Sequence, residues 1–357
     1  MISVSIVNVT SYTGVELLRL LAQHPQFVVT SVTARSAVGK RLDEVFPQLR
    51  ALEHLPDGTR AAVNPAIVLT EVPEKTDLAF VCLPHAAAAE SVLKLLERGT
   101  KVVDLSADFR LRNVAIYEEW YKHTHPAPSL LETAVYGLCE RYRTRIAEAS
   151  LIANPGCYAT ASILALIPAL AAGIISPDVI IDAKSGISGA GRSLSLTYHY
   201  AEANEDVSAY GLGGHRHLPE ITQELEAAAA AGGHPVKSAL RVTFIPHLMP
   251  MTRGILATCY GDLKQHTTSA EVRSLYAEYY ADEPFVHVVD TPPHTKWTYG
   301  SNACFIHPLV DARTNRLVVI SCLDNLVKGA AGQAVQSANR LYGLPETTGL
   351  PLVNVYP

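Results

Sequence analysis

One cysteine lies where the sequence predicts that a strand gives way to a helix. Residues 151–153 are apolar and end a buried strand, Pro155 and Gly156 predict a sharp turn, and residues 162–172 predict an apolar helix. Cys157 lies between them, where backbone N–H groups and the positive end of the helix dipole favour the thiolate. The pattern predicts a nucleophile, although a free cysteine is more often a buried hydrophobic residue.

Two histidines flank an arginine at a second predicted helix start. Gly213 and Gly214 come before them and Pro219 follows, as in a glycine turn that enters a helix. The helix dipole keeps a histidine there neutral, so the ring can take a proton from a thiol and later return it. His217, which adjoins the helix, is the preferred acid/base, and His215 is the alternative.

A candidate anion site follows a predicted strand at residues 101–105. Ligands bind at the carboxyl ends of strands in open α/β sheets. Ser106 and Arg110 are therefore predicted to hold an anionic group of the substrate. The alternative is a surface Arg110 that pairs with Asp108.

Composition limits the class of protein. The 357 residues predict two domains, and 48% hydrophobic with 18% charged residues is typical of a globular enzyme. A net charge of 29 − 34 = −5 without a basic run argues against a nucleic-acid partner. Six cysteines without a C-x-x-C pair predict no metal site and a reducing compartment. A strand-like start and no run long enough for a bilayer predict a cytoplasmic protein without a membrane partner.

Strands and helices alternate in the first 150 or so residues, which predicts a doubly wound parallel sheet of the Rossmann type that binds a dinucleotide. The strands are predicted at 2–9, 27–33, 78–83 and 101–105, and the helices at 15–23 and 86–98. After Cys157, a small-residue loop at 184–192 separates further predicted strands at 179–183, 241–246, 255–263, 304–310 and 317–323. These indicate an α+β domain with a mixed or antiparallel sheet. A closing helix at 330–341 is expected to pack on the first domain.

The loop after the first strand departs from the G-x-G-x-x-G pattern of dinucleotide-binding domains. Asn8 and Ser11 occupy glycine positions and only Gly14 remains. The hydroxyl groups of Thr10, Ser11 and Thr13 still predict a diphosphate site at the helix N-terminus.

The second strand predicts which dinucleotide binds. An NAD site usually has an acidic residue there, whereas this chain has Arg35 and Ser36, with Lys40 close behind. These side chains suit the 2′-phosphate of NADP. The alternative is that Arg35 is a solvated surface charge.

Five motifs, N-P-G-C-Y-A-T-A, S-G-I-S-G-A-G-R, H-R-H-L-P-E-I, P-H-L-M-P-M-T-R-G-I-L-A-T and D-N-L-V-K-G-A-A-G-Q-A-V-Q, follow one another along the chain. In this order they closely resemble the N-acetyl-gamma-glutamyl-phosphate reductase family, of the aspartate-semialdehyde dehydrogenase superfamily. The resemblance runs from residue 2 to the C-terminus. It implies NADPH-dependent reduction of N-acetyl-gamma-glutamyl phosphate to the semialdehyde and phosphate in arginine biosynthesis, through a thioester on Cys157, by a homodimer or homotetramer. The family loop G-x-x-G-Y-T-G appears here, at 8–14, as N-V-T-S-Y-T-G.

The resemblance, together with the patterns above, assigns a role to each candidate residue. It implies an NADP-binding domain at 1–153, a catalytic and oligomerisation domain at 154–323, and a returning helix and tail at 324–357. The catalytic residues would be Cys157 and His217. The cofactor would contact Thr10, Ser11, Tyr12, Thr13, Gly14, Arg35, Ser36, Pro84, Ser188, Gly189 and Asn325, and the substrate Ser106, Arg110, Asn154, Arg192 and His215.

Three other functions are compatible with these residues. A sister reductase would act on a related acyl phosphate, such as aminoadipyl phosphate on a carrier protein or aspartyl phosphate. A thiol acyltransferase or hydrolase would use the same cysteine and histidine without a cofactor, but would leave the N-terminal α/β unit unexplained. A dinucleotide-sensing regulator would explain the missing glycines, but not the intact cysteine and histidine.

Overall fold

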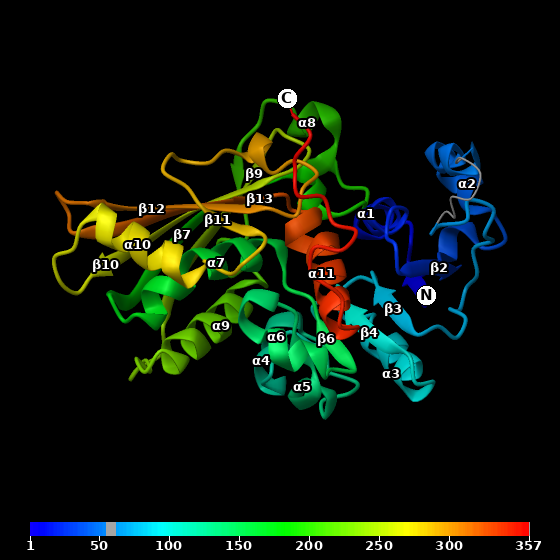
Figure 1. Ribbon diagram of the computed structural model, residues 1–357, viewed down its shortest axis with the longest axis horizontal. Helices are drawn as coiled ribbons and strands as arrows, with labels where there is room; N and C mark the ends of the chain where they lie inside the picture. Colours follow the sequence, from blue (N-terminus) through cyan, green and yellow to red (C-terminus); the bar gives the residue numbers. More distant parts are fainter. Residues whose placement is uncertain (55–61, 357) are drawn as a thin grey trace. The chain divides into compact units, whose positions relative to one another are not determined.

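The computed structural model describes residues 1–54 and 62–356, and the chain divides into two compact units (Figure 1). Unit 1 consists of Met1–Pro155 and Ala330–Pro351. Unit 2 consists of Gly156–Gly329 and the residues from Leu352 onward. Cys157 therefore belongs to unit 2, two residues beyond the end of the first segment of unit 1.

The sheet of unit 1 has six strands, all parallel, in the order β2-β1-β3-β4-β6-β5. The doubly wound sheet predicted from the sequence is thus confirmed. The strand order reverses direction between β1 and β3, and ligands bind at the carboxyl ends of strands at such a point. The strands are β1 (Ile2–Val7), β2 (Phe27–Val32), β3 (Leu78–Val81), β4 (Lys101–Asp104), β5 (Val135–Tyr136) and β6 (Leu151–Ala153).

Apolar strands and helix faces form the core of unit 1. Val81, Val92 and Val102 are fully buried in it, since the strands are covered on both faces. The helix at the end of this unit's chain, α11, packs on α6, and His24 Nε2 donates a hydrogen bond to Asn339 Oδ1 in α11 over 2.9 Å. The helices are α1 (Tyr12–Leu21), α2 (Leu42–Val45), α3 (Ala89–Glu97), α4 (Val114–Tyr121), α5 (Leu130–Thr133), α6 (Cys139–Ala147) and α11 (Gly332–Leu341).

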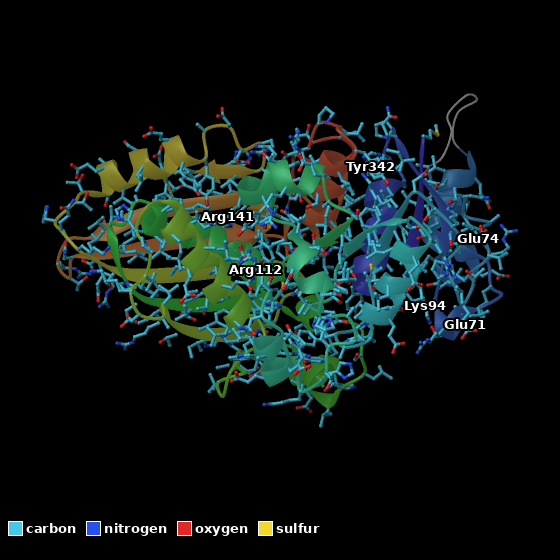
Figure 2. The ribbon with its side chains drawn as sticks, turned by 90° about the horizontal axis from the view of Figure 1, so that it is seen from below. Glu71, Glu74, Lys94, Arg112, Arg141 and Tyr342 are labelled. Carbon is cyan, nitrogen blue, oxygen red and sulfur yellow. The ribbon has the colours of Figure 1, made fainter. Side chains whose placement is uncertain are left out.

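Helix α6 is kinked at Tyr142, where φ is −120° and ψ is 22°. The guanidinium carbons of Arg112, Arg141 and Arg145 lie 5.4 to 5.9 Å from the centre of its ring. Arg112 and Arg141, labelled in Figure 2, both donate to the Tyr142 hydroxyl, over 3.0 and 3.2 Å. The electron-rich faces of the ring offset part of the repulsion among the three cations.

The sheet of unit 2 has seven strands in the order β11-β12-β13-β10-β7-β9-β8. Its longest strand, β7, pairs antiparallel with β10 and parallel with β9, so the mixed sheet predicted for this region is confirmed. The strands are β7 (Ile175–Gly186), β8 (Ser208–Ala209), β9 (Arg241–Met249), β10 (Ile255–Leu263), β11 (Val286–Val288), β12 (Cys304–Asp311) and β13 (Arg316–Leu323).

Helices cover one face of this sheet. α7 (Cys157–Ala171) packs against β7, β10 and β13, and against α9 (Leu218–Ala231) and α10 (Ser269–Tyr279) (Figure 1). The hydroxyl of Tyr276 in α10 donates to the Ala165 carbonyl of α7 over 2.7 Å. The helix α7 begins five residues earlier than predicted, at Cys157 itself.

Along β7, β10 and β13, the side chains that alternate with the buried ones belong to the opposite face of the sheet. Its side chains form a cross-strand apolar row in which Ile180 lies opposite Tyr260, Tyr260 opposite Val318, and Val318 opposite Leu309. Ile180 is exposed and the other three are half-buried. An apolar row of this kind on a sheet face is typical of a surface that another molecule covers.

Candidate active site

The turn that leads into α7 positions Cys157. Gly156 is the N-cap of this helix, and its N–H donates to Glu220 Oε1 of α9 over 2.8 Å. The carbonyl of Gly156 accepts the N–H of Thr160 and is thereby held within the helix. Glu220 is buried, so its bond fixes the turn before Cys157 to the helix that follows the histidines.

Cys157 differs from the other cysteines in exposure. Cys157 is half-buried, whereas Cys82, Cys139, Cys259, Cys304 and Cys322 are all buried. Burial raises the pKa of Cys82 to about 12 and raises the pKa of Cys259 and Cys322 as well. Buried thiols are poor nucleophiles. Cys157 and Cys139 are each the first residue of a helix, α7 and α6, and of these two only Cys157 reaches solvent.

The backbone of a π-helical turn, Val327–Ala331, packs directly on Cys157. A Cβ atom placed on Gly329 would lie 2.8 Å from the Cβ atom of Cys157. The buried carboxylate of Asp324 accepts the N–H groups of Gly300, Leu326 and Val327 over 2.8 to 3.1 Å, and its carbonyl accepts that of Gly329. The sequence reasoning did not assign Gly329 or Asp324, although both lie in the D-N-L-V-K-G motif.

The two histidines differ in their hydrogen bonding. His217 is the N-cap of α9, and its backbone N–H donates to His215 Nδ1 over 3.1 Å. Nδ1 of His215 therefore carries the lone pair, and the ring's hydrogen is on Nε2. Burial, with a smaller contribution from Arg216, lowers the pKa of His215 to about 4. At neutral pH the ring of His215 is therefore neutral and donates a hydrogen bond through Nε2.

Two tyrosines connect the histidines to the cysteine helix. The rings of His215 and His217 lie 5.8 and 6.0 Å from that of Tyr158, the residue after Cys157. The Tyr210 hydroxyl lies 3.2 Å from that of Tyr158, which donates to the His247 carbonyl over 3.1 Å. Burial raises the pKa of both tyrosines, so both stay protonated. Neither was predicted from the sequence, although Tyr158 stands beside Cys157 in its motif.

A loop of small residues follows β7 in the same unit. Ser188 and Gly189 lie in a 3₁₀ turn, Ile187–Ala190. Asn325 accepts the Gly254 N–H over 2.7 Å and donates to Ser188 Oγ over 2.9 Å. A Cβ atom on Gly189 would lie 2.8 Å from Ser185 Oγ, so only glycine allows this close approach. Arg192 follows the turn and is exposed.

The predicted nucleotide loop of unit 1 keeps two glycine-dependent features despite its departure from the glycine pattern. Asn8 has φ of 65°, the left-handed conformation that asparagine tolerates best after glycine, and its side chain donates to the Cys82 carbonyl. Ser11 caps α1 by accepting the Gly14 N–H over 3.0 Å. A Cβ atom on Gly14 would lie 2.6 Å from the Val9 carbonyl oxygen, so Gly14 permits close helix–strand packing.

The carboxyl ends of the strands of unit 1 carry groups of the kind that bind a dinucleotide. The N-terminus of α1, with Thr10 and Tyr12 beside it, presents N–H groups that have no partner within the helix. Arg35 and Ser36 are exposed directly after β2, and none of the described carboxylates pairs with Arg35. Pro84 is exposed after β3. Unit 1 thus has helix N–H groups and an exposed guanidinium beyond the ends of its strands.

Arg110 is buried, and its guanidinium binds backbone carbonyls. It donates from Nε to Asn154 O over 2.8 Å and from Nη2 to Leu105 O over 3.1 Å. It therefore holds the chain just before the N-P-G-C turn. The carboxylate of Asp108 accepts the N–H groups of Ala86, Ala88 and Ala89 at the start of α3.

Ser106 and Asn154 are also buried in unit 1. The Ser106 hydroxyl donates to Asp104 Oδ2 over 2.6 Å and accepts the Asp108 N–H. The Asn154 amide donates to the Ala330 carbonyl over 3.1 Å. Burial raises the pKa of Asp104 to about 7. Among the described residues, no group of three or more His, Cys, Asp or Glu side chains gathers as a metal site, and no helix is long and apolar enough to cross a membrane.

Comparison with known proteins first defines the class. Residues 3–149 match the NAD-binding domain of the semialdehyde dehydrogenases, and residues 157–325 match their dimerisation domain. The fold agrees, because aspartate semialdehyde dehydrogenase II from Vibrio cholerae superimposes with a TM-score of 0.68 at 16% identity, over 96% of this chain and 99% of that one. The aspartate semialdehyde dehydrogenase of Candida albicans, solved with NADP, gives 0.66 at 16% identity, over 96% and 99%.

Sequence relatives narrow this class to one family. The chain is 52% identical to the N-acetyl-gamma-glutamyl-phosphate reductase of Dehalococcoides mccartyi strain BAV1, over 99% of this chain and 98% of the relative. It is 49% identical to that of Heliobacterium modesticaldum, over the full length of both. The chain belongs to the N-acetyl-gamma-glutamyl-phosphate reductase family. The family resemblance predicted from the sequence is confirmed, as is a domain of the NAD(P)-binding type.

Proposed function

We propose that this protein reduces N-acetyl-gamma-glutamyl phosphate to N-acetylglutamate semialdehyde with NADPH, as a step of arginine biosynthesis. The observation that carries the proposal is the position of Cys157, the one cysteine that is not buried, at the N-terminus of α7. Both histidine rings lie beside Tyr158, the next residue in that helix. A half-exposed thiol with helix amides and an imidazole nearby is the arrangement that acyl transfer to sulfur requires.

The first half of the reaction is acyl transfer. His217 takes the proton of the Cys157 thiol, and the thiolate attacks the acyl carbon of the substrate. The carbon–oxygen bond to phosphate breaks, and inorganic phosphate leaves with one proton taken from solvent, so that a thioester remains on Cys157. N–H groups at the start of α7 stabilise the oxyanion that forms during the attack, since the helix dipole points its positive end there. The neutral His215 donates from Nε2 to the substrate.

The second half of the reaction is reduction of the thioester. NADPH, when bound, supplies a hydride to the thioester carbon. The resulting thiohemiacetal collapses, the carbon–sulfur bond breaks and the aldehyde leaves. The proton on His217 returns to the sulfur, which restores the thiol. Asn325 and Ser188 hold the loop that we assign to the nicotinamide end of the cofactor, with Gly189 allowing its close approach.

The rest of the cofactor and the substrate would be held by polar groups at strand and helix ends. We assign the diphosphate to residues 10–14 at the start of α1, the 2′-phosphate to Arg35 and Ser36, and the face of the nucleotide to Pro84. Arg110, Ser106 and Asn154 would lie near the phosphate and carbonyl of the substrate, with Arg192 as a further anion contact. The buried bonds of Arg110 and Ser106 support mainly a positioning role for these two residues.

We also propose that the protein forms a homo-oligomer. Unit 2 matches a dimerisation domain, and the apolar row Ile180, Tyr260, Val318 and Leu309 crosses four strands of its sheet with Ile180 exposed. We infer that two copies cover this row in a homodimer, with a homotetramer as the alternative. Six cysteines without a disulfide bond support a reducing compartment such as the cytoplasm.

The test is phosphate-dependent reduction of NADP⁺ with a panel of semialdehydes. The proposal predicts that N-acetylglutamate semialdehyde gives the highest kcat/KM, whereas a preference for aspartate semialdehyde or a carrier-bound aminoadipate derivative would identify a sister reductase. Intact-mass measurement with acyl phosphate and no NADPH should show an acyl adduct on the parent and none on Cys157→Ser. A Cys157→Ser variant with more than about a tenth of parental activity would contradict a thioester, because a factor of ten is only about 1.4 kcal/mol of barrier.

A further inference from the structure

Residues 192–212, which we call the arm, leave the sheet of unit 2 after the small-residue turn and return to it just before the histidines. None of the residues from 191 to 214 is buried. The arm is nevertheless regular: it contains a 3₁₀ turn at Leu196–Tyr198, the helix α8 (Tyr200–Ala203) and the strand β8, which pairs with β9. A one-turn helix is not stable alone in water, so this conformation requires support from a surface beside it.

The side chains of the arm indicate what kind of surface that is. Leu194 is 104% exposed and Tyr200 is 78% exposed, and three further large apolar side chains of the arm are exposed, namely Leu196, Val207 and Leu212. Between residues 193 and 204 the sequence has a single acidic residue, Glu202, and no lysine or arginine. Soluble monomers rarely expose so many large apolar side chains in one short segment, so an apolar surface of another molecule is the fitting partner.

Both ends of the arm are fixed to the candidate active site. At its start, Ile187 and Ser188 donate backbone hydrogen bonds to Met251 and Thr252, and Ser188 Oγ also accepts from Asn325. At its end, Tyr210 donates from its N–H to the Pro246 carbonyl over 3.1 Å. The hydroxyl of Tyr210 bonds that of Tyr158, beside Cys157.

Only glycines and one leucine separate Tyr210 from the first histidine. Gly211 has φ of 62°, and a Cβ atom there would lie 3.3 Å from His215 Cδ2. The arm is thus joined to His215 by a short segment whose first residue, Gly211, lies against the His215 ring.

We propose that the arm packs against a second copy of this chain and that this contact holds His215 and His217 in place. We choose a second copy of the chain as the binding partner of the arm because the arm lies within residues 157–325, which match a dimerisation domain. Its strand β8 is also the edge of the same sheet whose apolar row we assign to self-association. The proposal rests on the self-association inferred above, and it adds which segment takes part and how that contact reaches the active site.

The test uses the full chain with Leu194→Asp and Tyr200→Asp, introduced singly. Both side chains are exposed, so the charge does not disturb the core of one copy, whereas a charge buried against a second copy is costly. Val72→Asp is the matched control, because Val72 is 58% exposed on unit 1, outside the arm. Molar mass by sedimentation equilibrium, tryptic cleavage after Arg192 and Arg216, and kcat are measured for each variant.

We expect the dissociation constant of the oligomer to rise roughly tenfold or more in both arm variants, since interface anchors carry most of the association energy. Cleavage at Arg192 and Arg216 should accelerate, and kcat per chain should fall when the oligomer dissociates, while Val72→Asp behaves as the parent. An unchanged mass in both arm variants would overturn the proposal, as would a monomeric parent whose arm resists trypsin. A smaller mass with unchanged kcat would overturn the link to the histidines. Mass and cleavage need no substrate, so they stand even if the proposed reaction is wrong.

Discussion

Gly329 sets the position of the nucleophile, and replacing it with alanine should impair acylation more than stability. The added Cβ atom would lie 2.8 Å from Cys157 Cβ and 3.3 Å from the Asp324 carbonyl oxygen. An ordinary contact begins at 3.4 Å, so Cys157 or the π-helical turn must move by 3.4 − 2.8 = 0.6 Å or more. The φ of Gly329 is not in the left-handed region, so this effect is steric alone.

Such a displacement has different consequences for folding and for chemistry. Overpacking typically costs about 1–3 kcal/mol of stability. A misplacement of about 1 Å at reacting atoms costs up to roughly 10²-fold in rate, so we expect Gly329→Ala to acylate about 10- to 100-fold more slowly.

The assay is the single-turnover rate of acyl-adduct formation by intact mass, with acyl phosphate and no NADPH, beside the midpoint of urea unfolding. Gly261→Ala is the control, because its added Cβ atom would meet Ile175 at 3.0 Å in the same unit, where the end of β10 pairs with the start of β7. It should lose stability and keep its acylation rate. If both variants acylate at the parental rate, the close packing of Gly329 on Cys157 has no role in catalysis.

Three further predictions follow from the two units. Arg35→Ala should weaken NADPH binding about ten- to a hundredfold, because a charge-assisted phosphate contact is lost, and should leave NADH binding unchanged; fluorescence titration with both cofactors measures this. His217→Asn should lower kcat by about 10²- to 10⁴-fold with NADPH affinity intact, and His215→Asn less; a larger loss at His215 would reverse the two roles. Asp104 has a folded pKa of about 7, raised by burial above that of the unfolded chain, so the stability it contributes falls as pH rises from about 4 to 7. Asn at position 104 resembles the protonated acid and does not titrate, so the stability of Asp104→Asn lacks this pH dependence of at most about 1.4 kcal/mol per pH unit. The urea midpoint of the variant should therefore rise relative to that of the parent between pH 5 and 7, whereas parallel curves would show that Asp104 does not titrate there.

Local pattern was sufficient to predict most of the fold. Buried parallel strands are continuous apolar runs, and β10 spans the predicted 255–263 without change. The start of α7 was missed by five residues, because Cys157 and Tyr158 follow turn residues and carry no helix signal of their own. The arm was not predicted to contain α8 or β8, since neither has a buried face that a hydrophobic pattern can reveal.

The candidate site was only partly predictable for a related reason. The type of a residue indicates whether it can react, so Cys157 and the histidines were predicted. The close packing of Gly329 was not, because it is a contact with Cys157, more than 170 positions away in the sequence. Asn8 was predicted as a departure from the glycine pattern, whereas its backbone adopts the left-handed conformation that a glycine would supply. Arg110 was predicted to bind a ligand. In the structure it is buried and donates to two backbone carbonyls, a result of tertiary packing that the charge of the residue does not indicate.

The division of the chemistry between the units has a mechanistic consequence. Cys157, His215 and His217 all belong to unit 2, and the Gly156–Glu220 bond joins the starts of the two helices that carry the nucleophile and the preferred acid/base. The predicted diphosphate and 2′-phosphate contacts belong to unit 1. In the proposed mechanism, transfer of the acyl group to sulfur uses no cofactor, whereas reduction of the thioester does. Changes in the α1 loop should accordingly slow reduction of the thioester and leave its formation intact.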